Sequence, residues 1–251
     1  MPLLIAVVLA TALFVPSALA AEPECYEIQA ITAVPGKLDA LHDWLRDHRD
    51  DVLAKHGAEC VAFLVPVGET PGRKVLFVYR VPSLVEWLEF SQRLKADPAW
   101  KQASDGPDAF VEKVESVCLR PTYYSPDFTP TKAAQPRVFE LRTYTCPSPE
   151  SLAHLHYRFR DHTMGLFAKH GMENLIYWNP RDIDDANRKL IYLLGHKSVD
   201  AARESFAAFR KDPDWLAAKE ASEKKAGGSL TAKDGGVLSE FFVGTEYSPL
   251  R

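Results

Sequence analysis

Two stretches of the chain nearly repeat each other: residues 44–57 read WLRDHRDDVLAKHG and residues 158–171 read RFRDHTMGLFAKHG. Both place Arg-Asp-His at the same distance from a closing Ala-Lys-His-Gly. Landmarks that recur in the same order indicate an internal repeat. Two more landmarks recur in this way: Asp97-Pro98-Ala99-Trp100 returns as Asp212-Pro213-Asp214-Trp215, and Tyr124-Ser125-Pro126 returns as Tyr247-Ser248-Pro249.

Each copy has the pattern strand–helix–strand–strand–helix–strand, which is the ferredoxin-like arrangement. Helices cover one face of such a sheet and leave the other apolar face bare, so two units packed sheet to sheet cover both. The sequence therefore predicts an α+β fold, a dimeric α/β barrel made from one chain. The expected strands are 26–31, 60–67, 75–79, 117–124, 138–145, 175–178, 190–194 and 238–247, and the expected helices are 37–56, 83–96, a short one from Asp97, 151–170 and one from Ser198.

The chain divides into four segments. The uncharged run Leu3–Leu13, the helix breaker Pro16 and the small residues of Ala18-Leu19-Ala20 indicate a signal peptide that is cleaved near Ala20/Ala21. The mature protein is therefore expected to be periplasmic or secreted. The expected organisation is a signal peptide at 1–20, a first unit at 21–124, a proline-containing linker at 125–137 and a second unit at 138–251.

Composition narrows the possible partners. The 251 residues carry a formal net charge of −4 with mixed signs, so nucleic acid is not expected as a partner. No stretch of the mature chain is long and apolar enough to predict a membrane span. The sequence contains no P-loop, dinucleotide fingerprint or nucleophile elbow, and it points to no cofactor or metal.

The four cysteines permit disulfides in an exported protein, but none has CxxC or zinc-site spacing. Cys25 opens the first expected strand and Cys118 opens the fourth. Antiparallel neighbours would then hold these two cysteines at opposite ends of the sheet. The prediction is that Cys25 and Cys118 do not form a native disulfide, and the other pairings stay open.

His48 and His162 are candidate ligand-binding residues. The stripes Leu41-Leu45-His48-Val52 and Leu155-Phe159-His162-Leu166 place each histidine on the core-facing side of its helix. A histidine there can be a core residue with a backbone or hydroxyl partner, or it can line a ligand site, act as a base or ligate haem. By contrast, His154 and His156 are expected at the surface, and His56 and His170 have a structural explanation at helix ends.

A second candidate set lies on one strand. Glu140, Arg142 and Tyr144 alternate, so all three point to the same side. They can line a polar pocket or form a satisfied cross-strand network. The corresponding first-half positions are Glu27, Gln29 and Ile31, which have lost two of the three polar groups. A ligand site is therefore expected in the second half.

The chain resembles the NIPSNAP family within the dimeric α/β barrel superfamily. The resemblance rests on Phe139–Thr145 (FELRTYT), on Ala168-Lys169-His170-Gly171 and on Asp212–Trp215, and the first half repeats these more loosely. It implies the barrel fold, with ligands held between helix and sheet, and no particular reaction. Related barrels include cofactor-free monooxygenases and haem enzymes, which is an analogy of fold.

These observations lead to one principal hypothesis and two alternatives. The principal hypothesis is an exported protein that binds a small, partly apolar ligand between helix and sheet of the second half. The first alternative is an oxidoreductase, either a cofactor-free monooxygenase or a haem binder with His48 or His162 as axial ligand. The second is a non-catalytic protein-interaction module with an exposed apolar patch.

Overall fold

The computed structural model describes residues 24–68 and 72–251, without the side chains of 49–52, 54 and 56. The predicted signal peptide therefore lies outside the described residues. The strands are β1 (Cys25–Ala33), β2 (Glu59–Pro66), β3 (Lys74–Val81), β4 (Val111–Pro121), β5 (Val138–Thr145), β6 (Glu173–Pro180), β7 (Lys189–His196) and β8 (Val237–Gly244). The helices are α1 (Leu38–His56), α2 (Leu84–Ala96), α3 (Pro98–Asp105), α4 (Pro149–Arg158), the π-helix η1 (Phe159–Thr163), α5 (Met164–Lys169), the 3₁₀-helix η2 (Ala186–Arg188), α6 (Val199–Phe209) and α7 (Pro213–Ala226).

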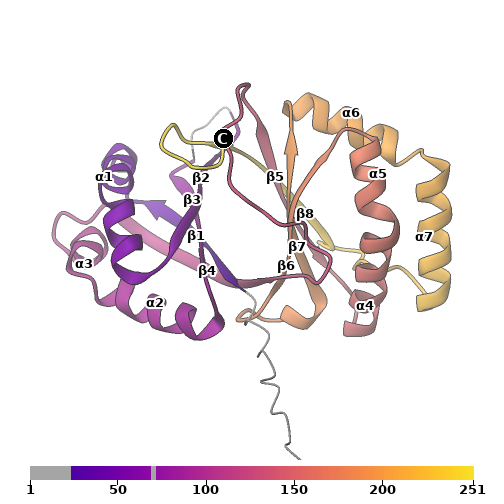
Figure 1. Ribbon diagram of the computed structural model, residues 1–251, viewed down its shortest axis with the longest axis horizontal. Coiled ribbons are helices and arrows are strands. Elements are labelled where there is room, and N and C mark those ends of the chain that lie inside the picture. Colours follow the sequence, from indigo (N-terminus) through magenta and orange to yellow (C-terminus); the bar gives the residue numbers. More distant parts are fainter. Residues whose placement is uncertain (1–23, 69–71) are drawn as a thin grey trace, which may run out of the picture.

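Eight strands form one closed antiparallel barrel in the order β1-β3-β2-β8-β5-β7-β6-β4 (Figure 1). The first half contributes β4-β1-β3-β2, and the second half contributes β8-β5-β7-β6 with the same relative order. The halves join edge to edge, β2 with β8 and β4 with β6. The predicted mixed α+β barrel is confirmed, and pairing between strand edges closes it.

The barrel separates three hydrophobic cores. One fills the interior of the barrel and is shared by both halves, with Tyr26, Phe139, Trp178 and Phe242 among its fully buried members. A second lies between the first-half strands and α1–α3. The third lies between the second-half strands and α4–α7, on the opposite side of the barrel (Figure 1). Both outer layers are therefore places where a side chain can face a helix and a strand together.

Helix starts follow the local sequence signals. The hydroxyl of Ser83 accepts a hydrogen bond from the backbone N–H of Glu86, and Ser198 caps α6 in the same way. Asp97 and Asp212 cap α3 and α7, each followed by proline at the first helical position. These starts confirm the predictions. Gly57 follows the end of α1 with a left-handed backbone, with φ of 77°.

Two predicted elements differ from the structure. The fourth strand was expected at 117–124 but runs from Val111 to Pro121. Its first part was not predicted because it is exposed and carries charges in place of apolar residues. Such charges are typical of a strand that is paired on one side only. The single helix expected at 151–170 is broken by the π-turn η1, so α4 and α5 are separate.

The predicted separation of Cys25 and Cys118 is wrong. Because β4 begins six positions before the expected start, Cys118 lies near the end of β4, opposite Glu27 and beside the start of β1. Both cysteines are fully buried, and contact with the Cys25 thiol, together with burial, raises the pKa of Cys118. The two thiols are neighbours on the same face of the sheet.

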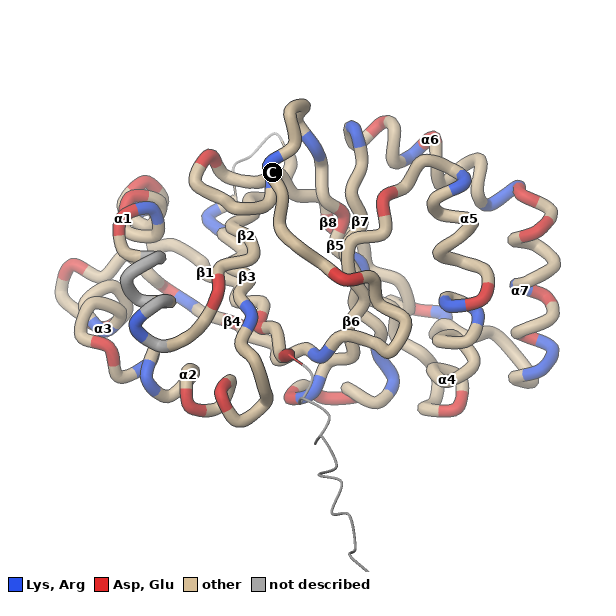
Figure 2. Tube along the Cα trace, viewed as in Figure 1, with Lys and Arg blue, Asp and Glu red and all other residues tan. Residues whose placement is uncertain are grey.

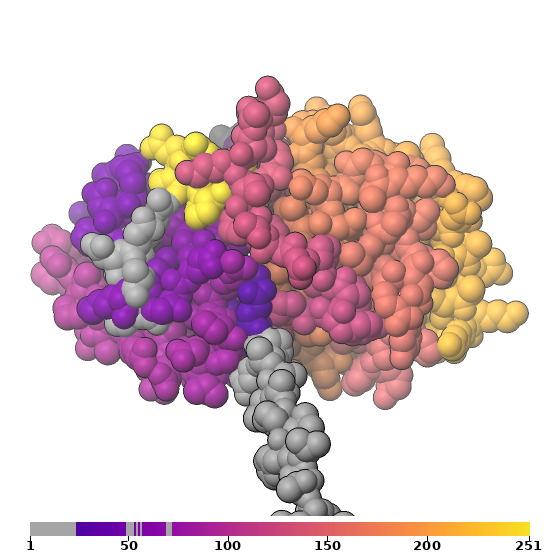
Figure 3. Space-filling view, in the orientation of Figure 1, coloured from indigo at the N-terminus to yellow at the C-terminus, as the bar shows by residue number. Residues whose placement is uncertain are grey.

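The segment that ends each half forms hydrogen bonds with a strand of the other half. The backbone N–H of Thr122 donates to the carbonyl of Tyr177 at 2.8 Å, and Thr245 donates to Phe63 at 2.9 Å. Ser125 and Ser248 accept hydrogen bonds from the backbone N–H groups of those same two residues. Figure 3 shows the consequence, with the yellow C-terminal segment lying against the indigo and violet first half. The repeated Tyr-Ser-Pro therefore joins the halves.

Candidate functional site

The polar face of β5 forms a buried network in the outer core of the second half. The Arg142 guanidinium bonds the Glu140 carboxylate, and its Nε donates to the Tyr192 hydroxyl at 2.9 Å. The Arg142 Nη2 lies 3.4 Å from the hydroxyl of Tyr144. The guanidinium carbon lies 4.5 Å from the ring centre of Phe206 on α6, which places the network between sheet and helix.

Two further residues complete this network, which we call the Glu140 network: Glu140, Arg142, Tyr144, Tyr192, His196 and Ser239. The carboxylate of Glu140 is 3.0 Å from the His196 Nε2 and accepts from the Ser239 hydroxyl at 2.5 Å. Burial alone would raise the pKa of Glu140, but the bonds from His196, Arg142 and Ser239 and the charge of Arg142 lower it overall. Glu140 is therefore a buried carboxylate held in its charged form.

Sequence reasoning placed Glu140, Arg142 and Tyr144 on one side of the strand, and this is confirmed. It missed His196 and Ser239. His196 ends β7 just beyond the strand predicted at 190–194, and Ser239 stands in β8 among exposed residues. Only the strand register, which pairs Val138 with His196 and Arg142 with Ser239, brings these residues to Glu140.

The first half has a corresponding network that contains a carboxylate but no arginine or histidine. Glu27, the equivalent of Glu140, is buried and accepts from Gln29 at 2.8 Å and from the Tyr79 hydroxyl at 2.6 Å. Trp87 and Ser91 on α2 also donate to it. Uncharged donors thus surround this carboxylate, whereas the second half uses Arg142 and His196. The two halves share a framework but differ in buried charge.

The expected core-facing position of His48 is wrong. Among the α1 side chains that the structure describes, Leu41, Leu45 and Leu53 are buried, at intervals of four and eight residues, and His48 is exposed. Its Nδ1 lies 3.2 Å from the carbonyl of Trp44, and its ring stacks on the Trp44 ring at 5.2 Å between centroids. His48 therefore lines no space between helix and sheet.

The expected core-facing position of His162 is also wrong. The π-turn η1 contains one more residue per turn than an α-helix, which changes the side that each following residue faces. Thr163 takes the buried position, and its hydroxyl donates to the carbonyl of Arg158 at 3.1 Å. The exposed His162 instead faces a groove on the outer side of the helices. Because the equivalent His48 is exposed on the unbroken helix α1 as well, η1 is not the whole reason: spacing by three and four does not decide between His162 and Thr163.

This groove, which we call the Arg158 groove, lies between α4–η1 and α7 and has a volume of about 160 Å³. At its base the side chain of Arg158 is 4% exposed, and the guanidinium carbon lies 5.0 Å from the ring centre of Trp215. His154 was expected at the surface but is half-buried here. The groove is lined by His154, Tyr157, Arg158, Asp161, His162, Ala218, Ala221, Ser222 and Lys225.

His156 is not the surface residue that was expected, because it is half-buried under the end of the first half. Its Nδ1 lies 2.8 Å from the hydroxyl of Tyr124, and burial lowers its pKa. It borders a cavity of about 420 Å³ with Asn179. His170 has the structural role that was expected, since its Nε2 lies 2.7 Å from Asp212 beyond the helix end.

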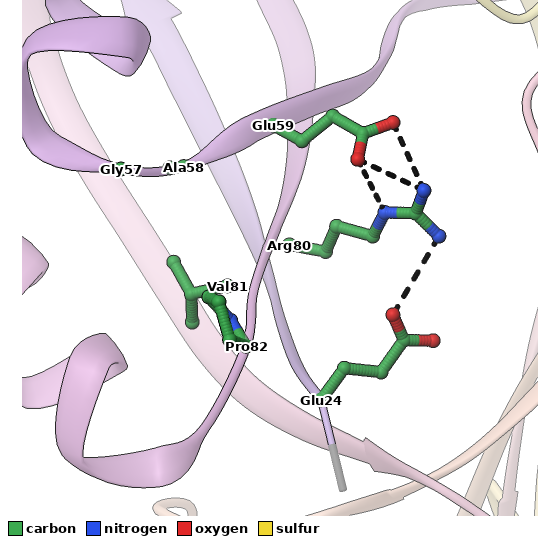
Figure 4. A pocket seen from close by; sticks show the side chains of 7 residues that line it. All are labelled: Glu24, Gly57, Ala58, Glu59, Arg80, Val81 and Pro82. Atoms are coloured by element: carbon green, nitrogen blue, oxygen red, sulfur yellow. Dashed lines mark hydrogen bonds and ion pairs between the residues drawn. The ribbon is translucent and has the colours of Figure 1, made fainter.

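Around another cavity, the charged side chains form ion pairs with one another. Figure 4 shows a hollow of about 380 Å³ in the first half, where Arg80 reaches Glu59 on one side and Glu24 on the other. The Arg80–Glu59 distance is 2.9 Å and the Arg80–Glu24 distance is 3.5 Å. Because these side chains form ion pairs with one another, they offer little free charge to a ligand.

Three further observations concern the charge distribution, metal binding and the hydrophobicity of the helices. Both signs are interspersed along the whole trace, without a continuous basic stripe on the face seen in Figure 2. Within the described part of the chain, no group of three or more His, Cys, Asp and Glu side chains could hold a metal ion. Of the helices in residues 24–68 and 72–251, none combines the length and apolar character needed to cross a membrane.

Comparison with known proteins agrees with the expected family. Residues 139–234, which include β5–β7 and the helices over them, match the NIPSNAP family. No curated protein has a detectably similar sequence. This match confirms the resemblance that was read from Phe139–Thr145 and Asp212–Trp215.

Three solved structures share the fold across nearly the whole chain. A proposed monooxygenase from Fusobacterium nucleatum is 12% identical with a TM-score of 0.57, over 89% of this chain and 93% of that one. A proposed monooxygenase from Lactobacillus acidophilus is 13% identical with a TM-score of 0.53, over 91% and 95%. A proposed chlorite dismutase is 10% identical with a TM-score of 0.50, over 90% and 96%. At these identities the likeness concerns the fold alone.

Proposed function

Because residues 139–234 of this chain match the NIPSNAP family, we propose that the protein is a small-ligand-binding barrel with its site in the second half, in the layer between the strands and the helices. The observation that carries this proposal is the difference between the halves. Arg142 corresponds to Gln29, and Arg158 corresponds to Trp44 when the Ala-Lys-His-Gly endings are aligned. At these two positions the second half has guanidinium groups and the first half has none.

Burying a charge is costly, so the arginines at these two positions of the second half need a reason. Taking an ion out of water costs several kcal/mol, and replacing a buried ion pair with apolar residues is often neutral or stabilising. The first half shows that this framework folds with Gln29 and Trp44 at the same positions. Arg142 and Arg158 are therefore better explained by an interaction with a ligand than by a need of the fold.

Two finer features belong to the same proposal. We infer that the halves are two ferredoxin-like units in tandem, which the equal strand order of β4-β1-β3-β2 and β8-β5-β7-β6 supports. We also infer that residues 1–20 are removed on export and that the mature protein is periplasmic or secreted, which the apolar run and Ala18-Leu19-Ala20 support. The mass of the denatured mature protein tests the cleavage site.

The function is tested by native mass spectrometry of the mature protein, compared with its denatured mass. A retained ligand appears as extra mass in the native spectrum. Arg142→Gln, which gives the second half the first-half residue, is expected to lower ligand retention, whereas Gln29→Ala is the matched first-half control. Circular dichroism confirms that both variants fold. A wild-type protein that retains no ligand, or equal retention in both variants, would contradict the proposal.

The oxidoreductase alternative finds no specific support in the site. His48 is stacked on Trp44, and His162 faces a groove of about 160 Å³, which is below the roughly 300–1,000 Å³ of typical ligand pockets. The residues at these two positions therefore do not fit haem as axial ligands. A Soret band in the purified protein would revive this alternative. The protein-interaction alternative predicts partner recovery with a bare native mass.

A further inference from the structure

The Arg158 groove contains a buried cation whose hydrogen bonds are largely unmade. A guanidinium group has five N–H donors. Among the described residues, the Arg158 Nη1 bonds the Ser222 hydroxyl at 3.3 Å and lies 3.8 Å from the Glu223 carboxylate, while its buried Nε has no partner. Burial lowers the pKa of Arg158 from its very high ordinary value. The groove thus presents hydrogen-bond donors with a positive charge.

With Glu223 counted beside Arg158, the three cations Arg158, Arg160 and Lys225 exceed the two carboxylates Asp161 and Glu223 by one, so the groove is positive. Asp161 is the one acidic residue in its lining, and Arg160 binds that carboxylate at 2.6 and 2.8 Å. The arginine charge lowers the pKa of Asp161 and offsets its negative charge. Lys225 adds a second cation, and two imidazoles, of His154 and His162, face the same space. An anion would meet donors from both helices.

The first half shows what this arrangement replaces. Trp44, the equivalent of Arg158, packs against Trp100 with ring centres 5.5 Å apart. Trp215, the equivalent of Trp100, instead lies beside the Arg158 guanidinium. His48 stacks on Trp44, whereas its equivalent His162 lines the groove. A hydrocarbon surface in one half is thus an open basic groove in the other.

Size indicates what the groove can hold. A volume of about 160 Å³ equals about five times the 30 Å³ that one water occupies in the liquid. This accommodates a phosphate or a carboxylate but not a whole drug-sized ligand. Arginine is the residue that binds both oxyanions best, through its planar set of donors.

We propose that the Arg158 groove binds the oxyanionic group, phosphate or carboxylate, of a small ligand. Arg158 is the buried anchor, and His154, His162 and Lys225 bind at the rim. This inference rests on the proposed function, names the chemical class of the ligand, and places its anionic group between α4–η1 and α7. It also gives His162 a binding role at a place different from the one predicted from the sequence.

The test is a calorimetric titration of the mature protein with inorganic phosphate and, separately, with acetate, at constant ionic strength set by chloride. Saturable binding of one of them is expected, and the stronger ligand identifies the class. Arg158→Gln should weaken that binding by about 10- to 100-fold, because hydrogen bonds to charged groups contribute about 1.5–3 kcal/mol. Arg203→Gln, which removes an exposed arginine from α6, is the control with the same change in charge.

A measurement on the wild-type protein keeps the test decisive if Arg158→Gln does not fold. In ¹H NMR spectra the ring signals of His154 and His162 should shift on addition of the anion, while those of His48 stay in place. Absence of saturable binding, unchanged affinity in a folded Arg158→Gln, or unshifted His154 and His162 signals would overturn the inference. The proposed function would still stand if a natural ligand is retained and depends on Arg142.

Discussion

The hydroxyl of Tyr247 and the Nδ1 of His42 form a hydrogen bond of 2.6 Å across 205 residues of sequence. Tyr124 and His156 form the equivalent bond at 2.8 Å, with the roles of the halves exchanged. Each histidine stands on the first helix of one half, and each tyrosine ends the other half. The two pairs, which we call the Tyr–His clamps, therefore join the halves reciprocally.

Loss of a Tyr–His clamp should destabilise the protein modestly. Tyr247→Phe and Tyr124→Phe each remove one hydrogen bond and keep the ring, so we expect a cost of about 0.5–1.5 kcal/mol in the free energy of unfolding. Urea unfolding measures it. Tyr157→Phe, at a tyrosine that is 51% exposed, should cost less than either. Equal effects at all three positions would contradict the structural role of the clamps.

The Tyr–His clamps should also make stability depend on pH. Burial lowers the pKa of His42 and of His156 below the ordinary 6.5. The unfolded chain then binds protons at a higher pH than the folded chain does. Stability from these residues is therefore complete above about pH 6.5 and falls as the pH drops through that value toward the folded pKa. Urea unfolding at a series of pH values measures this dependence.

The control for this pH dependence is the double variant His42→Gln, His156→Gln. It should be less stable than the wild type near neutral pH, and its stability should fall less between neutral pH and about pH 5. The carboxylates with lowered pKa, such as Glu140, lose their contribution at lower pH than the histidines do. An unchanged pH profile in the double variant would show that other groups are responsible.

The repeat and the helix caps were predictable because they depend on local chemistry. Ser83, Asp97 and their second-half equivalents cap helices through atoms two or three residues away. The barrel followed from the repeat, since a bare sheet face must be covered. Local signals of this kind predict the architecture without knowledge of the contacts between elements.

The candidate site was less predictable because it depends on registers and on one irregular turn. Helical spacing reveals neither η1 nor which of two neighbours, His162 or Thr163, is buried, so His162 was expected on the core-facing side although it is exposed. The strand register pairs Arg142 with Ser239 and Val138 with His196, and this brings Ser239 and His196 to Glu140. The burial of Arg158 was not predicted, because its difference from Trp44 becomes informative only when the positions of both side chains are known.

Removal of the central carboxylate should be costly. Glu140→Gln leaves the buried guanidinium of Arg142 without its counter-charge, so we expect a loss of roughly 3–5 kcal/mol in the free energy of unfolding. Glu240→Gln breaks an exposed ion pair with Lys74, and should cost less than about 1 kcal/mol. Urea unfolding distinguishes the two. Similar costs would show that the Glu140 network contributes little to the fold.

Removal of His48 or His162 should change the free energy of unfolding far less than removal of a core histidine would. Both are exposed, so His48→Ala and His162→Ala should each change the free energy of unfolding by less than about 0.5 kcal/mol. The buried Thr163 donates to the carbonyl of Arg158, and Thr163→Val should cost about 1 kcal/mol. Thermal unfolding ranks the three variants. A large loss in His162→Ala would place that side chain back in the core.

The adjacency of Cys25 and Cys118 predicts an oxidation product. Refolding with oxidised glutathione should join the two sulfurs, with two thiol protons and two electrons passing to glutathione, which is reduced. Burial and thiol contact raise the pKa of Cys118, so exchange in the folded protein should be slower than during folding.

Peptide mapping under non-reducing conditions detects this link. Cys146 lies in the outer core of the second half, whereas Cys25 lies in that of the first half, so Cys146 serves as the internal control that should remain alkylated. A crosslink between Cys25 and Cys118 would confirm that β4 carries Cys118 to the start of β1. Alkylation of all four cysteines after oxidative refolding, or a different pairing, would mean that the two strands do not bring these thiols within bonding reach, since a disulfide requires Cα atoms within about 7 Å.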